Sequence, residues 1–170
     1  MNKEDFIKKL PLITDRLIIK RTTLEDVELL LKMDKQEVTQ KYLGGIKHKT
    51  YEERIKFLKK KLLKEDVISM TVYVTNKSVG FIDIKILKNN ICELSYIFDN
   101  DYTNNGYCTE ACKVIIETLF NSFNIDKIIA DTLEDNLSSR KVLEKLNFTI
   151  SHTETKNNIK FIVYTKEKRC

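Results

Sequence analysis

The most informative stretch of this sequence is the polar segment Asp99-Asn-Asp-Tyr-Thr-Asn-Asn-Gly-Tyr-Cys-Thr-Glu-Ala111. It follows Ile91 to Phe98, a segment rich in β-branched and aromatic side chains that is typical of a strand. It leads into Tyr107 to Phe123, where apolar residues recur at the spacing of an amphipathic helix. Its single glycine, Gly106, stands directly before that helix. A strand, a polar loop and a long helix in this order predict an α/β domain.

The start of the helix after Gly106 is chemically suited to an anion. The first amides of a helix have no intrahelical acceptor, and the helix dipole places partial positive charge at the same end. A residue without Cβ also lets a ligand approach the backbone closely, so the segment predicts a phosphate or pyrophosphate site. The alternative is an ordinary connection whose asparagines cap the helix.

Seven strands are expected in the whole chain. Three of them, Ser69 to Thr75, Val79 to Leu87 and Ile91 to Phe98, are joined by short connections that contain asparagines, which predicts an antiparallel meander. The other four are expected over Thr14 to Arg21, Lys127 to Leu133, Thr149 to Glu154 and Ile159 to Lys166. The last two should form a closing hairpin.

Capping signals and helical spacing predict four further helices. They are expected after Thr23 with Asp26 three positions later, over Gln36 to Tyr42 before Gly44 and Gly45, after the capping box of Thr50 and Glu53, and over Asn136 to Leu146. In the third of these, Ile55, Leu58, Leu62 and Leu63 stand at helical spacing. Strands interleaved with helices predict a mixed sheet with helices on its faces, and a ligand site at the carboxyl end of Ile91 to Phe98.

Composition favours a single domain over residues 1–170. Hydrophobic content of 42% and charged content of 32% are those of an ordinary globular protein, and the apolar runs are too short for a membrane span. Residues 1–10 lack the apolar region of a secretory signal, so we expect a cytoplasmic protein that crosses no membrane. The four cysteines show no C-x-x-C spacing, so no metal site is expected. The net charge of +5 permits an anionic ligand without identifying one.

Three short motifs carry a resemblance to a known family. They are the loop Thr103-Asn-Asn-Gly-Tyr-Cys108, continuing as Thr-Glu-Ala111; the helix start Asn136-x-x-Ser139 with Leu146-Asn-Phe148; and the strand segment Glu93-Leu-Ser-Tyr96. In this combination the chain resembles the GNAT superfamily of acyl-CoA-dependent N-acyltransferases, and especially its ribosomal-protein N-terminal acetyltransferase-like branch. The resemblance extends in element order from Leu12 to Lys166.

The resemblance implies a mixed, mostly antiparallel seven-stranded sheet flanked by helices, with an acyl-CoA site between splayed central strands. Acetyl-CoA would be the co-substrate. Backbone amides from Asn105 to Thr109 would hold the CoA pyrophosphate, and Asn136 would bond the pantetheine arm. The full set of cofactor-binding residues implied is Tyr96, Ile97, Phe98, Thr103, Asn104, Asn105, Gly106, Tyr107, Cys108, Thr109, Asn136 and Ser139.

Five positions depart from the family's pattern. Thr103 replaces a long Gln or Arg, and Cys108 replaces a Gly or Ala. Ser95 and Asn147 stand where the family has glycines, although Asn also tolerates the left-handed conformation. Leu143 stands where many members have a tyrosine that acts as general acid. The reduced donor set of the loop predicts weaker CoA affinity.

Transfer of an acetyl group from a thioester to an amine needs a neutral amine, a polarised carbonyl and a proton for the thiolate. Glu93 and Asp131 are the candidate bases, because a carboxylate within an apolar strand is costly unless it is paired or functional. A salt bridge is the alternative role for each. Ser139 is the candidate proton donor, since the resemblance places it near the sulfur, and helix capping is its alternative. Backbone amides of residues 93–97 would, by the same resemblance, stabilise the oxyanion.

The resulting functional expectation is an acetyl-CoA-dependent N-acetyltransferase that acts on a primary amine, with a protein N-terminal amine as one candidate. A peptide, a polyamine and an aminoglycoside all remain open as acceptors. The alternative from another class is a non-catalytic module that binds acyl-CoA. Nucleic-acid binding ranks last, because the lysines at 59–61 and 64 have no aromatic residues between them and should form a solvated face. The chain should be a monomer or a homodimer.

Overall fold

The computed structural model describes residues 1–42 and 50–168. In this part of the chain, eight strands form one sheet in the order β1-β2-β3-β4-β5-β6-β8-β7. The strands are β1 (Leu12–Ile13), β2 (Leu17–Arg21), β3 (Val67–Val74), β4 (Lys77–Ile86), β5 (Ile91–Phe98), β6 (Lys127–Leu133), β7 (Thr149–Lys156) and β8 (Ile159–Glu167). All neighbouring pairs are antiparallel except β5 and β6. The expected mixed, mostly antiparallel sheet is confirmed, with one strand more than the seven expected.

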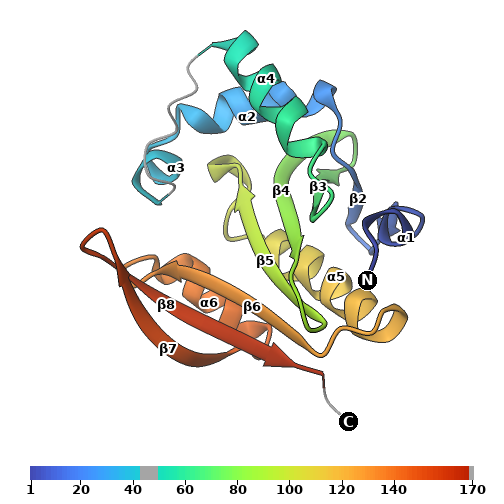
Figure 1. The fold of residues 1–170 in the computed structure, drawn as a ribbon. Helices are drawn as coiled ribbons and strands as arrows, with labels where there is room; N and C mark the ends of the chain where they lie inside the picture. Colours follow the sequence, from blue (N-terminus) through green and yellow to red (C-terminus); the bar gives the residue numbers. More distant parts are fainter. Residues whose placement is uncertain (43–49, 169–170) are drawn as a thin grey trace.

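The helices lie between the strands along the chain (Figure 1). They are α1 (Lys3–Ile7), α2 (Val27–Asp34), α3 (Glu37–Tyr42), α4 (Tyr51–Leu62), α5 (Tyr107–Ser122) and α6 (Leu137–Lys145), with short 3₁₀ turns η1 (Leu24–Asp26) and η2 (Asn100–Tyr102). The capping boxes at Thr23 and Thr50 form as expected. The two glycines at which α3 was expected to end, Gly44 and Gly45, lie outside the described residues.

The first expected strand differs most from its prediction. Residues Thr14 to Arg21 form one continuous alternating pattern in the sequence, but only Leu17–Arg21 forms β2. A bend at Asp15 and Arg16 separates β2 from the two-residue strand β1, which folds back on it. This bend supplies the extra strand and, as described below, brings Arg16 to the site.

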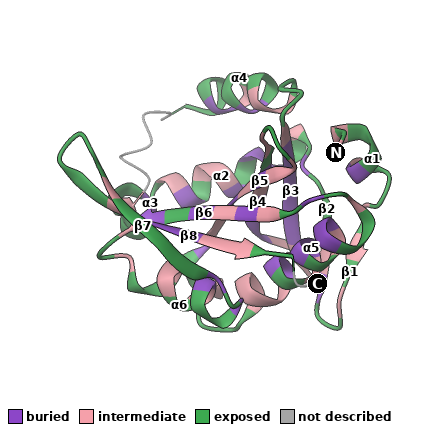
Figure 2. Ribbon diagram, turned by 60° about the horizontal axis from the view of Figure 1, so that its bottom comes forward, coloured by how far each residue is buried: buried purple, intermediate pink, exposed green. Residues whose placement is uncertain are grey.

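Helices cover both faces of the sheet. Adjacent residues of β4 show this, because neighbouring side chains in a strand point to opposite faces. Ile82 belongs to the main core with residues of α5, whereas Phe81 packs with Leu29 and Met33 of α2. Figure 2 shows α4 with its outer surface exposed and β7 exposed along most of its length at the edge of the sheet.

Helix α4 buries one apolar and one charged side chain, Leu58 and Arg54. Leu58 is buried, but Leu63 is 81% exposed because the helix ends at Leu62 and its next residue turns outward. Arg54 is buried instead, and its guanidinium makes a two-pronged ion pair with Asp34 at the end of α2. Lys61, expected on a solvated face, is half-buried and pairs with Asp83 of β4.

Strands β5 and β6 diverge at the centre of the sheet. Their parallel pairing covers Ile91 to Glu93 on β5 and ends at the pair Glu93 and Ile129. On its other edge β5 continues in register with β4 as far as Gly80 and Phe98. Residues 94–98 of β5 therefore have strand partners in β4 alone, and Figure 1 shows β5 and β6 separating above this point. The expected splay of the central strands is confirmed.

Candidate active site

The loop between β5 and α5 ends at Gly106, the N-cap residue of α5, which has a φ of 79°. A Cβ at this position would meet Arg16 Nη2 at 3.5 Å, an ordinary contact, so the positive φ rather than lack of space requires glycine. No side chain caps this helix end, and the first intrahelical bond runs from the Glu110 amide to the Gly106 carbonyl at 3.0 Å. The amides of residues 107–109 precede that bond and are positioned to bind an anion.

Arg16 holds this loop from the side of β1 and β2. Its Nη1 donates to the Asn105 carbonyl at 3.0 Å, its Nε donates to Glu110 at 2.7 Å, and its guanidinium lies 4.8 Å from the centre of the Tyr107 ring. Burial opposes the ionisation of Glu110, but hydrogen bonds from Thr14 and Arg16 outweigh it and lower the pKa of that carboxyl. Arg16 and Glu110 were not predicted at the site, because they are 94 positions apart in the sequence.

The polar side chains within the loop bond the loop itself. The Thr103 hydroxyl donates to the Asn100 carbonyl at 2.9 Å, and the Asn105 amide donates to the Thr103 carbonyl at 3.0 Å. Asn104 takes a φ of 61°, a conformation that asparagine tolerates. The alternative role of helix capping is therefore not seen for Asn105, whose side chain turns back from α5. Thr103, expected to contact phosphate weakly, also points into its own loop.

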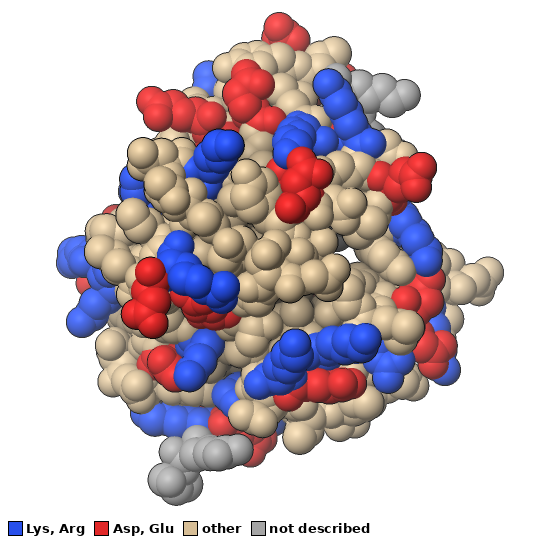
Figure 3. Space-filling view, turned by 180° about the vertical axis from the view of Figure 1, so that it is seen from behind, with Lys and Arg blue, Asp and Glu red and all other residues tan. Residues whose placement is uncertain are grey.

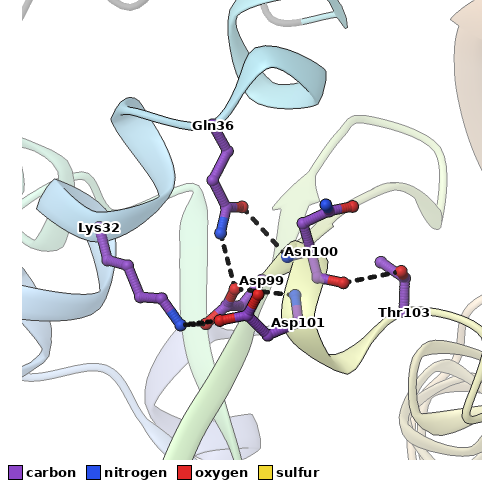
Figure 4. Close-up of polar contacts among 6 residues, drawn as sticks. All are labelled: Lys32, Gln36, Asp99, Asn100, Asp101 and Thr103. Carbon is purple, nitrogen blue, oxygen red and sulfur yellow. Dashed lines mark hydrogen bonds and ion pairs between the residues drawn. The ribbon is translucent and has the colours of Figure 1, made fainter.

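Asp99, the residue after β5, anchors the start of this loop to α2 (Figure 4). Its carboxylate is 1% exposed and accepts hydrogen bonds from Lys32 Nζ at 2.5 Å and Gln36 Nε2 at 2.7 Å. Burial opposes ionisation of Asp99, but the hydrogen bonds from Lys32, Gln36 and the Asp101 amide outweigh it and lower its pKa. Asp99, Lys32 and Gln36 were not expected at the site.

A second group of hydroxyls lies between the unpaired half of β5 and α6. The Tyr96 hydroxyl donates to the Ser139 carbonyl at 3.1 Å and lies 2.9 Å from the Ser139 hydroxyl. Burial is the main cause of a strongly raised pKa for Tyr96. Asn136 caps α6 by accepting from the Ser139 amide at 3.2 Å and the Ser138 hydroxyl at 2.8 Å. The capping role considered for Ser139 thus belongs to Asn136, which leaves the Ser139 hydroxyl facing Tyr96.

The remaining expected cofactor residues lie around these two groups. Ile97 packs beside the α2 cluster, and Phe98 lies against Gly80, where a Cβ would come within 2.7 Å of its ring. Cys108 and Cys112 occupy successive turns of α5, and burial, followed by the neighbouring Cys108, raises the pKa of Cys112. Tyr107 and Thr109 belong to the first turn of α5. The structure thus gathers the expected residues at the carboxyl end of β5.

The two candidate bases differ in exposure. Glu93 is half-buried at the last pair between β5 and β6, whereas Asp131 on β6 is exposed. The expectation that both carboxylates are buried in apolar strands is wrong for Asp131. Strand alternation turns Glu93 away from the α5 face, and on the other face α2 and α4 contact β4 and β3. Neither carboxylate forms an ion pair among residues 1–42 and 50–168, so the alternative salt-bridge role is not seen there.

Lys156 shares the face of Glu93 and Asp131. Its ammonium pairs with Glu154 at 2.5 Å and lies 5.5 Å from the centre of the Phe161 ring. The hydrogen bond to Glu154 raises the pKa of Lys156 most, and the charges of Glu154, Asp131 and Glu93 raise it further. Glu93, Asp131 and Glu154 thus share this face with Lys156, and Lys85 lies opposite Glu93 on β4.

Leu143, at the position where many relatives have a tyrosine, is fully buried with 0% exposure. It belongs to the main apolar core with Leu146 and Phe148. Ser139 on α6 and Tyr96 on β5, described above, do carry hydroxyls. Any proton donor at this end of the sheet must therefore be supplied by a residue other than the one at 143.

The rest of the described surface carries mixed charge. On the face shown in Figure 3, Lys and Arg side chains are interspersed with Asp and Glu. Among the helices of the described residues, none is long and apolar enough to cross a membrane. The same residues contain no group of three His, Cys, Asp or Glu side chains that could hold a metal ion.

Comparison with known proteins gives a family match. Residues 16–149 match the model of the acetyltransferase (GNAT) domain. An uncharacterized N-acetyltransferase of Bacillus subtilis, YjdG, is 32% identical over 65 residues, which cover 38% of this chain and 39% of that protein. The chain thus aligns with less than two fifths of the length of this curated relative.

Solved structures share the whole fold. The acetyltransferase (GNAT family) from Bacillus anthracis superposes with a TM-score of 0.81 at 23% identity, covering 92% of this chain and 98% of that one. RimL, the ribosomal L7/L12 alpha-N-protein acetyltransferase, in complex with coenzyme A, superposes with a TM-score of 0.82 at 15% identity, covering 92% and 97%. These structures show the shared fold, and the domain match over residues 16–149 shows that the chain belongs to the GNAT acetyltransferase family.

Proposed function

We propose that this protein is an N-acetyltransferase that transfers an acetyl group from acetyl-CoA to a primary amine. One observation carries the proposal: the uncapped start of α5 at Gly106 lies next to the half of β5 that has no partner in β6. The first feature offers amide donors to a diphosphate, and the second offers unpaired strand backbone to an extended, amide-containing arm such as pantetheine.

The residues present fit acetyl-CoA in three places. The amides of Asn105 to Thr109 would bind the diphosphate, with Arg16 holding the loop in shape. Backbone groups of Tyr96 to Phe98 would bond the pantetheine arm, and Asn136 would meet it from the other side of the splay. Asn136 Oδ1 is occupied by its capping bonds, so its amide N–H groups are the part available to the ligand.

The proposed reaction breaks the thioester C–S bond and forms a C–N bond, while the attacking amine loses one proton and the thiolate gains one. Glu93 would accept the amine proton, directly or through a water. Backbone amides of residues 93–97 would stabilise the oxyanion. Tyr96 donates its own hydrogen to the Ser139 carbonyl, so Ser139 would turn its O–H from the Tyr96 oxygen to the departing sulfur. Because the pKa of Tyr96 is strongly raised, Tyr96 would orient Ser139 rather than release its own proton.

The acceptor would approach from the face that carries Glu93. A cationic amine would pair with the carboxylates of this face, Glu93, Asp131 and Glu154, in competition with Lys156 and with Lys85, which lies opposite Glu93. At pH 7 an α-amine with a pKa of about 7.7–8.0 is neutral about a tenth of the time, whereas a lysine side chain of about 10.4 is neutral about once in 2,500. A protein or peptide N-terminus is therefore the acceptor that demands least of the base.

A non-catalytic acyl-CoA-binding module is the second candidate, favoured by the burial of Leu143 at the usual tyrosine position. Thiol release from acetyl-CoA distinguishes the two. The acceptors are a peptide with a free N-terminus, spermidine and an aminoglycoside, with the Nα-acetylated peptide as matched control. The proposal expects amine-dependent thiol release that is absent with the blocked peptide. Binding of acetyl-CoA without release for any acceptor would support the module, and absence of binding would reject both.

A further inference from the structure

Two side chains from the end of α2 bind Asp99, the first residue of the loop between β5 and α5. This loop, residues 99–106, is called the cofactor loop below. Lys32 lies on the last turn of α2, and Gln36 lies two residues beyond the helix. Lys32 Nζ donates to Asp99 at 2.5 Å and to Asp101 at 2.6 Å, and Gln36 Nε2 donates to Asp99 at 2.7 Å. Gln36 also accepts from the Asn100 amide at 3.1 Å. Lys32 and Gln36 together therefore bind each of the residues 99, 100 and 101 (Figure 4).

Asp99 joins this network to the rest of the loop. Its carboxylate accepts from the Asp101 amide at 3.1 Å, and its own amide donates to the Val79 carbonyl of β4 at 2.9 Å. The Asn100 carbonyl in turn accepts from Thr103, three residues before Gly106. A single buried side chain thus touches α2 on one side and the turn that leads to the anion-binding amides on the other.

Lys32 also offsets negative charge near the proposed diphosphate site. Asp99 and Asp101 place two carboxylates within the segment that leads to the proposed diphosphate site. Lys32 bonds both, and hydrogen bonds to Asp101 and Asp99 raise its pKa, so the ammonium stays charged and offsets them. Without Lys32, like charges would weaken binding of an anion nearby.

We propose that Asp99 is a positioning residue that couples α2 to the cofactor loop, so that occupancy of the loop by CoA stabilises α2. The inference rests on the proposed function, because it takes CoA as the ligand of the loop. Helix α2 packs on Phe81 and beside Ile97, on the face that also carries Glu93. The network therefore transmits cofactor binding to the helix that borders the acceptor side of the sheet, without Asp99 touching either substrate.

Hydrogen exchange with and without CoA tests the coupling in the full-length protein. In the wild type, CoA should slow exchange in residues 99–109 and also in residues 27–36, the latter by about fivefold, at the lower end of usual coupling. In Asp99→Asn the loop response should remain and the α2 response should be lost. Lys32→Met should reduce the α2 response, Lys32→Arg should restore it, and Lys35→Met, which removes an exposed charge from the same helix end, should behave as the wild type.

The possible results distinguish failure of the coupling from failure of the proposed function. A wild-type loop response without any α2 response overturns the coupling while leaving the proposed function intact, and so does an α2 response that survives in Asp99→Asn. Absence of any response in residues 99–109 overturns the proposed function, and the coupling falls with it. If Asp99→Asn does not fold, Lys32→Met and Gln36→Leu carry the same test, because each removes a donor to Asp99 and leaves its carboxylate in place.

Discussion

The hydroxyl groups of Tyr96 on β5 and Ser139 on α6 lie 2.9 Å apart, beside the half of β5 that has no partner in β6. This contact joins two elements that are separated by 43 positions in the sequence. It also places two hydroxyls close to the place where the family resemblance expects a proton donor, whereas Leu143 offers none. In the proposed mechanism Ser139 donates to the sulfur and Tyr96 orients Ser139, so the pair would take the part that a single tyrosine has in many relatives.

Tyr96→Phe tests the role of this pair. Removing the hydroxyl deletes its contacts with the Ser139 carbonyl and with the Ser139 hydroxyl. The second contact orients the proposed donor, and its loss should lower kcat about fivefold, since such a bond contributes about 1 kcal/mol. The dissociation constant for acetyl-CoA should change much less. Initial rates of thiol release and calorimetric titration measure the two quantities. Ser122→Ala, which removes an exposed hydroxyl at the end of α5, is the control, and an unchanged kcat in Tyr96→Phe would remove Tyr96 from the mechanism.

Matched substitutions distinguish the roles of the Glu93 and Asp131 carboxylates. Glu93→Gln should lower kcat/KM for the amine by about a hundredfold, the lower range of general-base contributions. Asp131→Asn should lower it much less, because Asp131 is exposed and lies beyond the last pair of β5 and β6. Steady-state kinetics at saturating acetyl-CoA provide the comparison. The reverse order of effects would assign the base to Asp131.

The sequence predicted the elements from β5 to α6 almost residue for residue. Alternation, the glycine before α5 and the Asn136 cap are local signals, and they placed the loop, α5, β6 and α6 correctly. The pairs Arg16 with Glu110 and Lys32 with Asp99 were not predicted, because they join residues 94 and 67 positions apart and no local pattern encodes them. The exposure of Asp131 was also missed, since strand periodicity assigns a face but not what covers it.

Arg54→Met tests the buried ion pair between α4 and α2. The substitution leaves the Asp34 carboxylate without its charged partner, and loss of one member of a buried pair costs about 3–5 kcal/mol. Chemical denaturation should show a decrease in the free energy of unfolding of about that size. Lys59→Met, an exposed position on the same helix, should change it by less than about 0.5 kcal/mol. Equal effects of the two substitutions would mean that the pair does not stabilise the fold.

The pKa of Glu110 predicts a pH-dependent contribution to stability. Its carboxyl has a lower pKa in the folded protein than the ordinary value of about 4.3, so its ionised form favours folding. The stability difference between wild type and Glu110→Gln should be fully present above about pH 5, and should be lost as the pH falls through 4.3 towards the lower folded pKa. Denaturation at a series of pH values measures it. A difference that stays constant down to pH 3 would contradict the assignment.

A crystal structure of the protein with CoA tests the central proposal most directly. We expect the diphosphate within about 2.7–3.1 Å of amide nitrogens in residues 105–109, the pantetheine arm between residues 94–98 of β5 and the start of β6–α6, and the sulfur next to the Ser139 hydroxyl. A diphosphate bound away from the start of α5, or an arm that does not enter between β5 and β6, would contradict the account.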